Sequence, residues 1–367
     1  MVETKREWNV DGLRVLSMLM VVCLHFFSHG GLSDALTPSV NWVAGNLLLA
    51  ACFVAVNCFV IISGYYLCTA EFKLKKLANL WVQALVYSVG CCVIVSVMTG
   101  SFLLKELVKS GMVVTLEQYW FVTAYLLLYC VFPFLNRAIR SMDRKLHLLF
   151  CIVLLGLFSV AHNIVYINDF GGVNGGYSFL WFCVLYVVAA YVRLYVPKDR
   201  FGWKKPLCCY LACVVITAGE RIAAYYITPY IFGRVVLTSL FYPYNSIPLV
   251  LASFSLFQFF RAIDIHNKVV STIIRAVSPL TFGVYLIHEN RFVRPLLWGF
   301  LEPARFAGSP LMIPIVIACT ITIFLVCCVI EWLRRLLFQK CGITGAIGKV
   351  CDRLQFRVLQ WLQTDIK

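Results

Sequence analysis

Charged residues are scarce in this chain. They make up 13% of its 367 residues, whereas apolar residues make up 61%. Soluble domains typically hold about 25% charged and about 45–50% apolar residues. Apolar runs of about 20 residues, each long enough to cross a bilayer core, account for nearly all of these residues. The composition therefore excludes an ordinary soluble protein and leaves no room for a soluble domain of ordinary size.

Other features are missing as well. The chain has no internal repeat, no low-complexity tract and no linker, so we expect one membrane domain. The first apolar run follows Lys5 and Arg6, but no small-residue cleavage site comes after it. Because further apolar runs follow, this run is interpreted as a retained helix and not as a cleaved signal peptide.

Cysteines are numerous, but their spacing excludes the usual cysteine chemistry. Most of the 17 cysteines lie inside apolar runs, where thiols behave as small hydrophobic side chains. The adjacent pairs Cys91-Cys92, Cys208-Cys209 and Cys327-Cys328 lack the separated pairs of zinc sites. We therefore predict core-packing cysteines and no metal site.

The fold predicted from the apolar runs is an all-α polytopic bundle of about ten transmembrane helices. The predicted spans are 13–28, 42–67, 77–99, 119–136, 147–166, 178–196, 207–227, 239–260, 277–297 and 310–333. If the chain starts inside, 25 of its 32 basic residues fall in cytoplasmic segments. This imbalance is typical of the positive-inside rule, so both termini are predicted to be cytoplasmic.

The net charge of +15 has the same explanation. Anionic lipid headgroups are the natural partner of basic cytoplasmic loops, and nucleic acid is not required. After the last span, apolar residues between Gly345 and Trp361 recur at three- and four-residue steps with charged residues between them. We thus expect a transmembrane domain over 1–340 and a cytoplasmic amphipathic tail over 341–367.

Two ionisable residues inside the first apolar run are the strongest indication of function. Arg14 and His25 are eleven residues apart. On a helix this separation brings both side chains within about 20° of one face, at a rise of about 16 Å. Ionisable groups are costly in hydrocarbon and are usually functional there. The alternatives to a functional role are that Arg14 is a cation at the inner membrane interface and that His25 is a hydrogen-bonded imidazole of the core.

Four motifs in order resemble the acyltransferase-3 family of integral-membrane acyltransferases. They are Asp11-Gly12-Leu13-Arg14 with His25, Ile62-Ser63-Gly64-Tyr65-Tyr66-Leu67, Tyr119-Trp120-Phe121 with Phe132-Pro133-Phe134-Leu135-Asn136, and Thr281-Phe282-Gly283-Val284-Tyr285-Leu286-Ile287-His288. The resemblance implies a ten-span bundle that takes an acyl group, commonly acetyl, from cytoplasmic acetyl-CoA. It also implies delivery to a sugar hydroxyl of a glycan at the outer face, in a bacterial cytoplasmic membrane.

The chain departs from the family after its second span. There the family often has two arginines three residues apart, whereas this chain has Lys73 and Lys76. Lysine attracts phosphate as a point charge but lacks the bidentate fork of arginine. We expect Arg14, Lys73 and Lys76 to bind the acyl-CoA donor, which would be a substrate and not a resident cofactor.

Transfer to a hydroxyl needs a base or an acyl carrier, and the chain has only six histidines. His25 is the predicted catalytic base or transient acyl carrier, with Arg14 and His288 as the other catalytic candidates. Glu220, Arg221 and Trp120 are the predicted acceptor contacts near the outer face, although interfacial aromatic belts and helix-end charges are common without such a role.

Two functions therefore stay open at this stage. The first is an O-acyltransferase that acts on a cell-surface polysaccharide or lipid-linked glycan. The alternative is a non-enzymatic exporter or flippase of glycan intermediates, because buried charges mark transport pathways as well as catalytic sites. The motif pattern favours the enzyme. The oligomeric state is not predicted.

Overall fold

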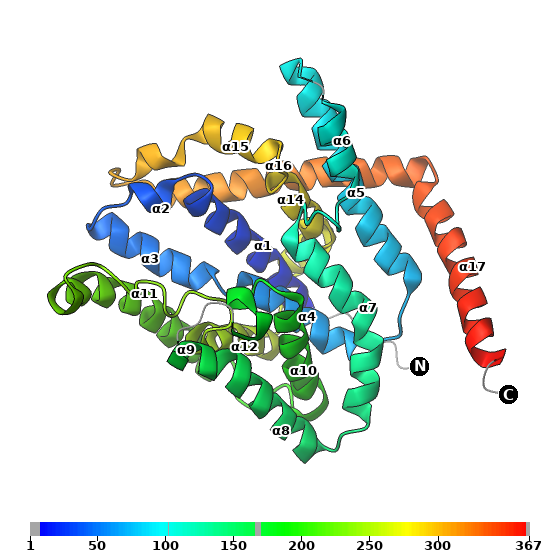
Figure 1. Cartoon of the computed structure of the whole chain (residues 1–367), viewed down its shortest axis with the longest axis horizontal. Helices are drawn as coiled ribbons and strands as arrows, with labels where there is room; N and C mark the ends of the chain where they lie inside the picture. The colour runs from blue at the N-terminus through cyan, green and yellow to red at the C-terminus, as the bar shows by residue number, and fades with distance from the viewer. Residues whose placement is uncertain (1–7, 102, 166–169, 365–367) are drawn as a thin grey trace.

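The computed structural model describes residues 8–101, 103–165 and 170–364, and every regular element in these ranges is a helix (Figure 1). The longer helical segments are α1 (Trp8–Ser28), α3 and α4 (Val40–Cys52 and Ala55–Leu67), α5 (Leu74–Thr99), α7 (Trp120–Arg140), α8 (Arg144–Leu155), α10 (Phe179–Tyr195), α11 (Lys204–Phe232), α12 (Ile247–Ala262), α13 and α14 (Lys268–Val277 and Thr281–His288), α16 (Met312–Lys340) and α17 (Ile343–Thr364). The short helices are α2 (Leu32–Ala35), α6 (Leu104–Gly111), α9 (Ala161–Val165) and α15 (Val293–Leu301).

The predicted polytopic bundle is confirmed. Within the described ranges, seven helical segments are long and apolar enough to cross a membrane, and α10 and α12 are shorter apolar helices. A further segment runs from α8 to α9 through a π-helical turn at Gly156–Val160. Together these segments lie where the ten spans were predicted.

One predicted span begins later than expected. The apolar run at 239–260 becomes helical only at Ile247, and Pro248 lies in the first turn of α12. Proline is tolerated there, because its missing N–H would have no partner in the helix. The preceding segment is held by other bonds: the Tyr244 carbonyl accepts from Asn57 at 2.7 Å, and the Tyr244 amide donates to Gly175 at 2.8 Å.

The predicted span 277–297 is wrong at its end. The membrane helix stops at His288, and α15 starts only at Val293. Asn290 makes the turn between them, because its side-chain oxygen accepts from the Phe292 amide at 2.9 Å. An asparagine that binds the backbone two residues ahead is a typical turn former. His288 thus lies at the end of a helix and not in its middle.

Close backbone packing holds the interior together. Gly64 of α4 faces α10 so tightly that an added Cβ would lie 2.9 Å from the Cβ of Ala189 and 3.0 Å from the Cα of Tyr186. Small residues allow such approaches between membrane helices, where the lipid provides no hydrophobic drive for association. The Gly64 motif read from the sequence therefore marks a helix contact.

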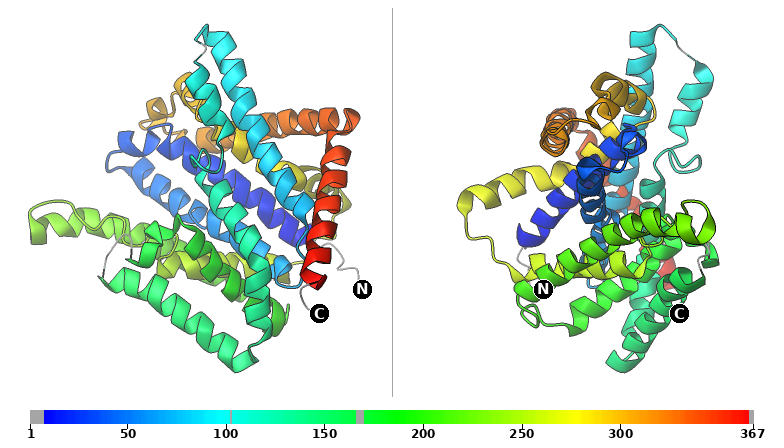
Figure 2. Two further views of the ribbon diagram at one scale, coloured as in Figure 1. Left: turned by 45° about the vertical axis from the view of Figure 1, so that its right-hand side comes forward. Right: turned by 90° about the vertical axis from the view of Figure 1, so that its left-hand side faces the viewer.

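The first helix occupies the centre of the molecule. It packs against α3, α4, α12, α13, α14 and α16, as Figures 1 and 2 show. Arg14 and His25, both on α1, are thereby brought among residues from the whole length of the chain.

The last helix, α17, lies across the end of the bundle where α5 begins, in the left view of Figure 2. Its Gln355 side chain binds the backbone on both sides of Lys73. The side-chain oxygen accepts from the Leu74 amide at 2.8 Å, and the side-chain nitrogen donates to the Phe72 carbonyl at 3.1 Å. The Leu74 amide is one of the donors that a helix start leaves without an internal partner. The tail therefore caps α5 and fixes the α4–α5 loop.

Candidate active site

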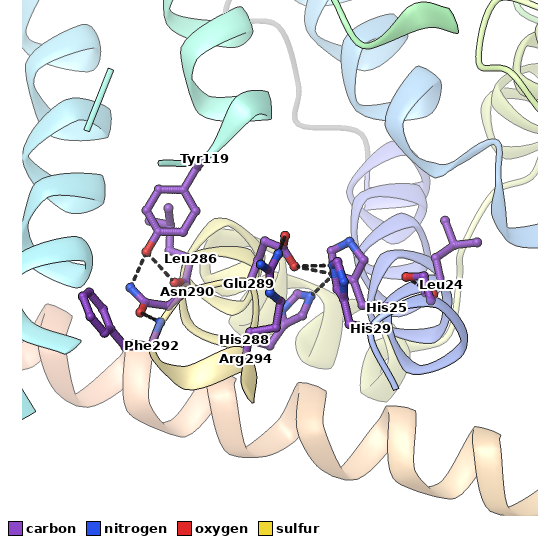
Figure 3. Close-up of polar contacts among 11 residues, drawn as sticks. Leu24, His25, His29, Tyr119, Leu286, His288, Glu289, Asn290, Phe292 and Arg294 are labelled. Carbon is purple, nitrogen blue, oxygen red and sulfur yellow. Dashed lines mark hydrogen bonds and ion pairs between the residues drawn. The ribbon is translucent and has the colours of Figure 1, made fainter. Parts of the chain in front are cut away.

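His25 and His288 meet in the interior. Nδ1 of His25 on α1 lies 2.9 Å from Nε2 of His288 on α14. Figure 3 shows the His25 and His29 side chains directed toward the end of α14, where His288 and Glu289 lie. His288 is fully buried, whereas His25 lines a cavity. The structure thus brings together two of the predicted catalytic residues from opposite ends of the sequence.

The hydrogen bonds assign the protons of this pair. Nδ1 of His288 lies 2.6 Å from the Val284 carbonyl, which can only accept. Nδ1 of His288 therefore carries a proton, and the Nε2 of a neutral His288 has a free lone pair. His25 must then donate from Nδ1. Nε2 of His25, to which no described residue hydrogen-bonds, is left unprotonated and able to accept a proton.

A carboxylate completes the cluster. Oε2 of Glu289 lies 3.2 Å from Nδ1 of His25 and 3.1 Å from Nε2 of His29. Its other oxygen, Oε1, accepts from Arg294 at 3.1 Å. A carboxylate beside an imidazole N–H orients the ring and stabilises the imidazolium that forms when the ring takes a proton. Because Nδ1 of His25 donates to His288, Glu289 acts on His25 as a nearby negative charge at 3.2 Å and not through a hydrogen bond.

Hydrogen bonds and an ion pair from other helices hold the end of α14 in place. The Tyr119 hydroxyl donates to the Leu286 carbonyl at 3.0 Å and accepts from the Asn290 side chain at 2.7 Å. Farther along, Arg291 pairs with Glu106 of α6. A hydrogen bond from Lys109 lowers the pKa of Glu106, and the charge of Arg291 acts in the same direction. These contacts fix the backbone that carries His288 and Glu289.

A cavity of about 960 Å³ connects this cluster with the other end of α1. Arg14 and Ser278 line it at one end, and His25, His29 and Glu289 line it at the other. The walls between them are mainly apolar and aromatic. Its residues come from helices throughout the bundle, namely Arg14, Met18, Val21, Leu24, His25, Phe53, Phe59, Leu80, Trp120, Phe121, Tyr125, Tyr177, Arg221, Tyr244, Phe282, Tyr285 and Glu289 among others. A long, narrow molecule can therefore reach from Arg14 to His25.

The predicted donor residues lie at the Arg14 end. Arg14 donates to Asp11 at 3.1 Å and lies over the Tyr66 ring. Lys73 and Lys76 are at the start of α5 and are not among the described residues that line the cavity. Lys76 nevertheless lies close enough to Lys73 and Arg14 for their positive charges to act on its ammonium group. The three cations thus lie near one another at the Arg14 end of the cavity.

Of the predicted acceptor contacts, Trp120 and Arg221 line the cavity, whereas Glu220 is not among its described lining residues. Arg221 is held by the Thr238 carbonyl at 2.8 Å and stacks 3.6 Å from the Tyr242 ring centre. Glu220 instead accepts from the Leu240 amide at 3.2 Å. Its position favours a role in fixing the loop before α12.

His29 belongs to the site although no sequence motif pointed to it. It follows His25 by four residues, and this spacing puts both side chains on one side of a helix. The ring centres of His25 and His29 lie 4.8 Å apart. One ring nitrogen of His25, one of His29 and a Glu289 oxygen lie within 4.8 Å of one another, and residues of these types ligate transition metals. His288, buried behind His25, would act through that ring.

Comparison with known proteins identifies the family of this chain. The model of the acyltransferase-3 domain, described as an acyltransferase domain, matches residues 7–332. No curated protein and no solved structure matches the chain significantly. The matched region contains Arg14, His25, His288 and the helices that surround the cavity. The chain belongs to the acyltransferase-3 family and is a multi-pass membrane acyltransferase.

Proposed function

We propose that this protein transfers an acetyl group from cytoplasmic acetyl-CoA to a sugar hydroxyl of a cell-surface polysaccharide or lipid-linked glycan, in a bacterial cytoplasmic membrane. The cavity that joins Arg14 to His25 is the observation that carries this proposal. It offers a path between a cytoplasmic donor and an acceptor at the outer face. We also propose that residues 1–340 form the transmembrane acyltransferase domain and that residues 341–367 form a cytoplasmic amphipathic tail.

His25 is the proposed base. Its Nε2 takes the proton of the acceptor hydroxyl while that oxygen bonds to the carbonyl carbon of the thioester. The bond from that carbon to sulfur then breaks, and the proton leaves with the CoA thiol. Glu289 and His288 hold the opposite side of the ring through Nδ1. The same free Nε2 could instead carry the acetyl group transiently.

The donor and acceptor sides are separate in this proposal. Arg14, Lys73 and Lys76 attract the phosphates of CoA, because converging cations bind phosphate through charge-assisted hydrogen bonds. At the other end, Trp120 offers an aromatic face to the sugar and Arg221 offers donors. Both of these residues line the same cavity as His25.

The direct test is CoA release by the purified protein. Acetyl-CoA is supplied with and without an extract of surface glycans, and free CoA and acetylated glycan are measured. We expect glycan-dependent CoA release in equal amounts with acetylated product. An exporter or flippase would release no CoA, and that result would refute the proposed reaction.

Replacing Lys73 and Lys76 together by glutamine should raise the KM for acetyl-CoA by at least tenfold and change kcat less. Charge-assisted hydrogen bonds contribute about 1.5–3 kcal/mol each, and contacts far from the thioester act mainly as uniform binding. Steady-state kinetics at saturating glycan measure both constants. The matched control is Lys204→Gln with Lys205→Gln, at the exposed start of α11. An equal KM in both double variants would remove the donor role.

The membrane orientation is a separate prediction. Because most basic residues fall on one side, reporter fusions after Gly172 should be extracytoplasmic and fusions after Lys340 cytoplasmic. Paired alkaline phosphatase and green fluorescent protein fusions measure this, since each is active on only one side of the membrane. The opposite pattern would put the Arg14 end of the cavity on the extracytoplasmic side of the membrane, where acetyl-CoA is absent.

A further inference from the structure

Three side chains at the outer end of the cavity have the geometry of an ion site. Oε2 of Glu289 lies 3.2 Å from Nδ1 of His25 and 3.1 Å from Nε2 of His29, and one potential ligand atom of each of the three residues lies within 4.8 Å of the other two. Zinc binds imidazole nitrogen and carboxylate oxygen at about 2.0–2.2 Å, so neighbouring ligands on a tetrahedral ion stand roughly 3.3–3.5 Å apart. Small side-chain shifts would bring all three atoms to this spacing.

The surroundings suit a cation as well. Arg294 donates to Oε1 of Glu289 and leaves Oε2 directed at the imidazoles. Hydrogen bonds of this kind to a ligand carboxylate orient it for a metal. Both imidazoles sit at the cavity wall and the His29 side chain is 30% exposed, so an ion has a way in. Two histidines and one carboxylate leave the fourth position of a tetrahedral ion open for water.

Binding an ion here would change the protonation of His25. A metal takes the lone pair of Nδ1, so the proton that Nδ1 otherwise carries moves to Nε2. The hydrogen bond to His288 is then lost, and Nε2 can no longer accept a proton from a hydroxyl. The base that the reaction requires is thus blocked while the ion is bound.

We propose that His25, His29 and Glu289 form a binding site for Zn²⁺ at the outer end of the cavity, and that the bound ion reversibly inhibits acyl transfer. The inhibition rests on the proposed function of His25, whereas ion binding does not. Soft thiolates are not required, because imidazole and carboxylate are common zinc ligands.

The test measures binding and activity separately on the full-length protein in detergent after removal of metals by a chelator. Zn²⁺ is titrated in competition with a chromophoric zinc indicator, and bound zinc is counted by elemental analysis. We expect one tightly bound zinc per chain. His29→Ala and, independently, Glu289→Gln should each weaken binding at least tenfold, while His266→Ala, in the loop before α13, should leave it unchanged. Two variants are used so that misfolding of one does not prevent the test.

Activity provides the second readout. Zn²⁺ should inhibit CoA release by the wild-type protein, a chelator should restore it, and His29→Ala should need a higher zinc concentration for half inhibition. Absence of stoichiometric binding, or equal binding by wild type and both variants, would overturn the site. Binding without inhibition would overturn the blocking role. A wild-type protein with no transferase activity at all would refute the proposed function instead, and the binding titration would still be informative.

Discussion

Replacing His25 by alanine should reduce acetyl transfer by about 10²–10⁴-fold, the usual contribution of a positioned acid or base. His25 lines the cavity, and its Nε2 is the nitrogen of the His25–His288 pair that the described hydrogen bonds leave with a free lone pair. His288 is fully buried, and Nε2 of His29 faces Glu289 at 3.1 Å, so neither ring is placed to replace it without movement. CoA release under single-turnover conditions measures the loss.

The control is His266→Ala, which changes an imidazole outside the cluster. Unchanged thermal unfolding of His25→Ala would show that the fold survives. If His25 carries the acetyl group, labelled acetyl-CoA without acceptor should leave label on the wild-type chain and none on the variant. Near-normal turnover of His25→Ala would instead mean that the ring only fills the core.

The second large effect concerns stability. Glu331 of α16 is buried, and its carboxylate accepts from Tyr87 at 2.8 Å and from Arg334 at 2.8 and 2.7 Å. Glu331→Ala would leave the half-buried Arg334 without its counter-charge, and removing one partner of a buried pair costs about 3–5 kcal/mol. We expect a large fall in the melting temperature of the purified protein, measured by thermal unfolding in detergent.

Two further variants test the cause. Asp264→Ala removes an exposed partner of Lys198 and should change stability by less than about 1 kcal/mol. Glu331→Leu combined with Arg334→Leu should recover much of the stability lost in Glu331→Ala, because both charges are then gone. If the double variant is as unstable as the single one, packing around α16 and not charge is responsible.

Hydropathy predicted the membrane helices because bilayer thickness fixes the length of an apolar run. It could not predict their ends. Residues 239–246 fall within the run that was predicted to span, but bonds from Tyr244 to Asn57 and Gly175 hold this segment outside α12. Likewise, the turn after His288 depends on Asn290, whose partner Tyr119 is 171 residues away. Such contacts form only when distant segments pack together, so the local sequence does not reveal them.

The site was predictable in part. The spacing of Arg14 and His25 indicated one face of one helix, and both residues line the cavity. The contact between His25 and His288 spans 263 residues of sequence and follows from no local pattern. His29 could have been found from its four-residue spacing to His25. The burial of His288 and the bond between Glu220 and Leu240 depend on how α11 and α14 pack, which a sequence without a fold does not specify.

The bond between Gln355 and the α4–α5 loop has a consequence for how the protein is made. Leu74 and Gln355 are separated by 281 residues, so the loop leaves the ribosome long before its partner exists. Chains are synthesised from the N-terminus, and early segments fold before late ones. The histidine cluster is complete once α14 has joined α1, but the loop around Lys73 is completed only when α17 docks. A nascent chain would therefore complete the loop around Lys73 last, after its interior has assembled.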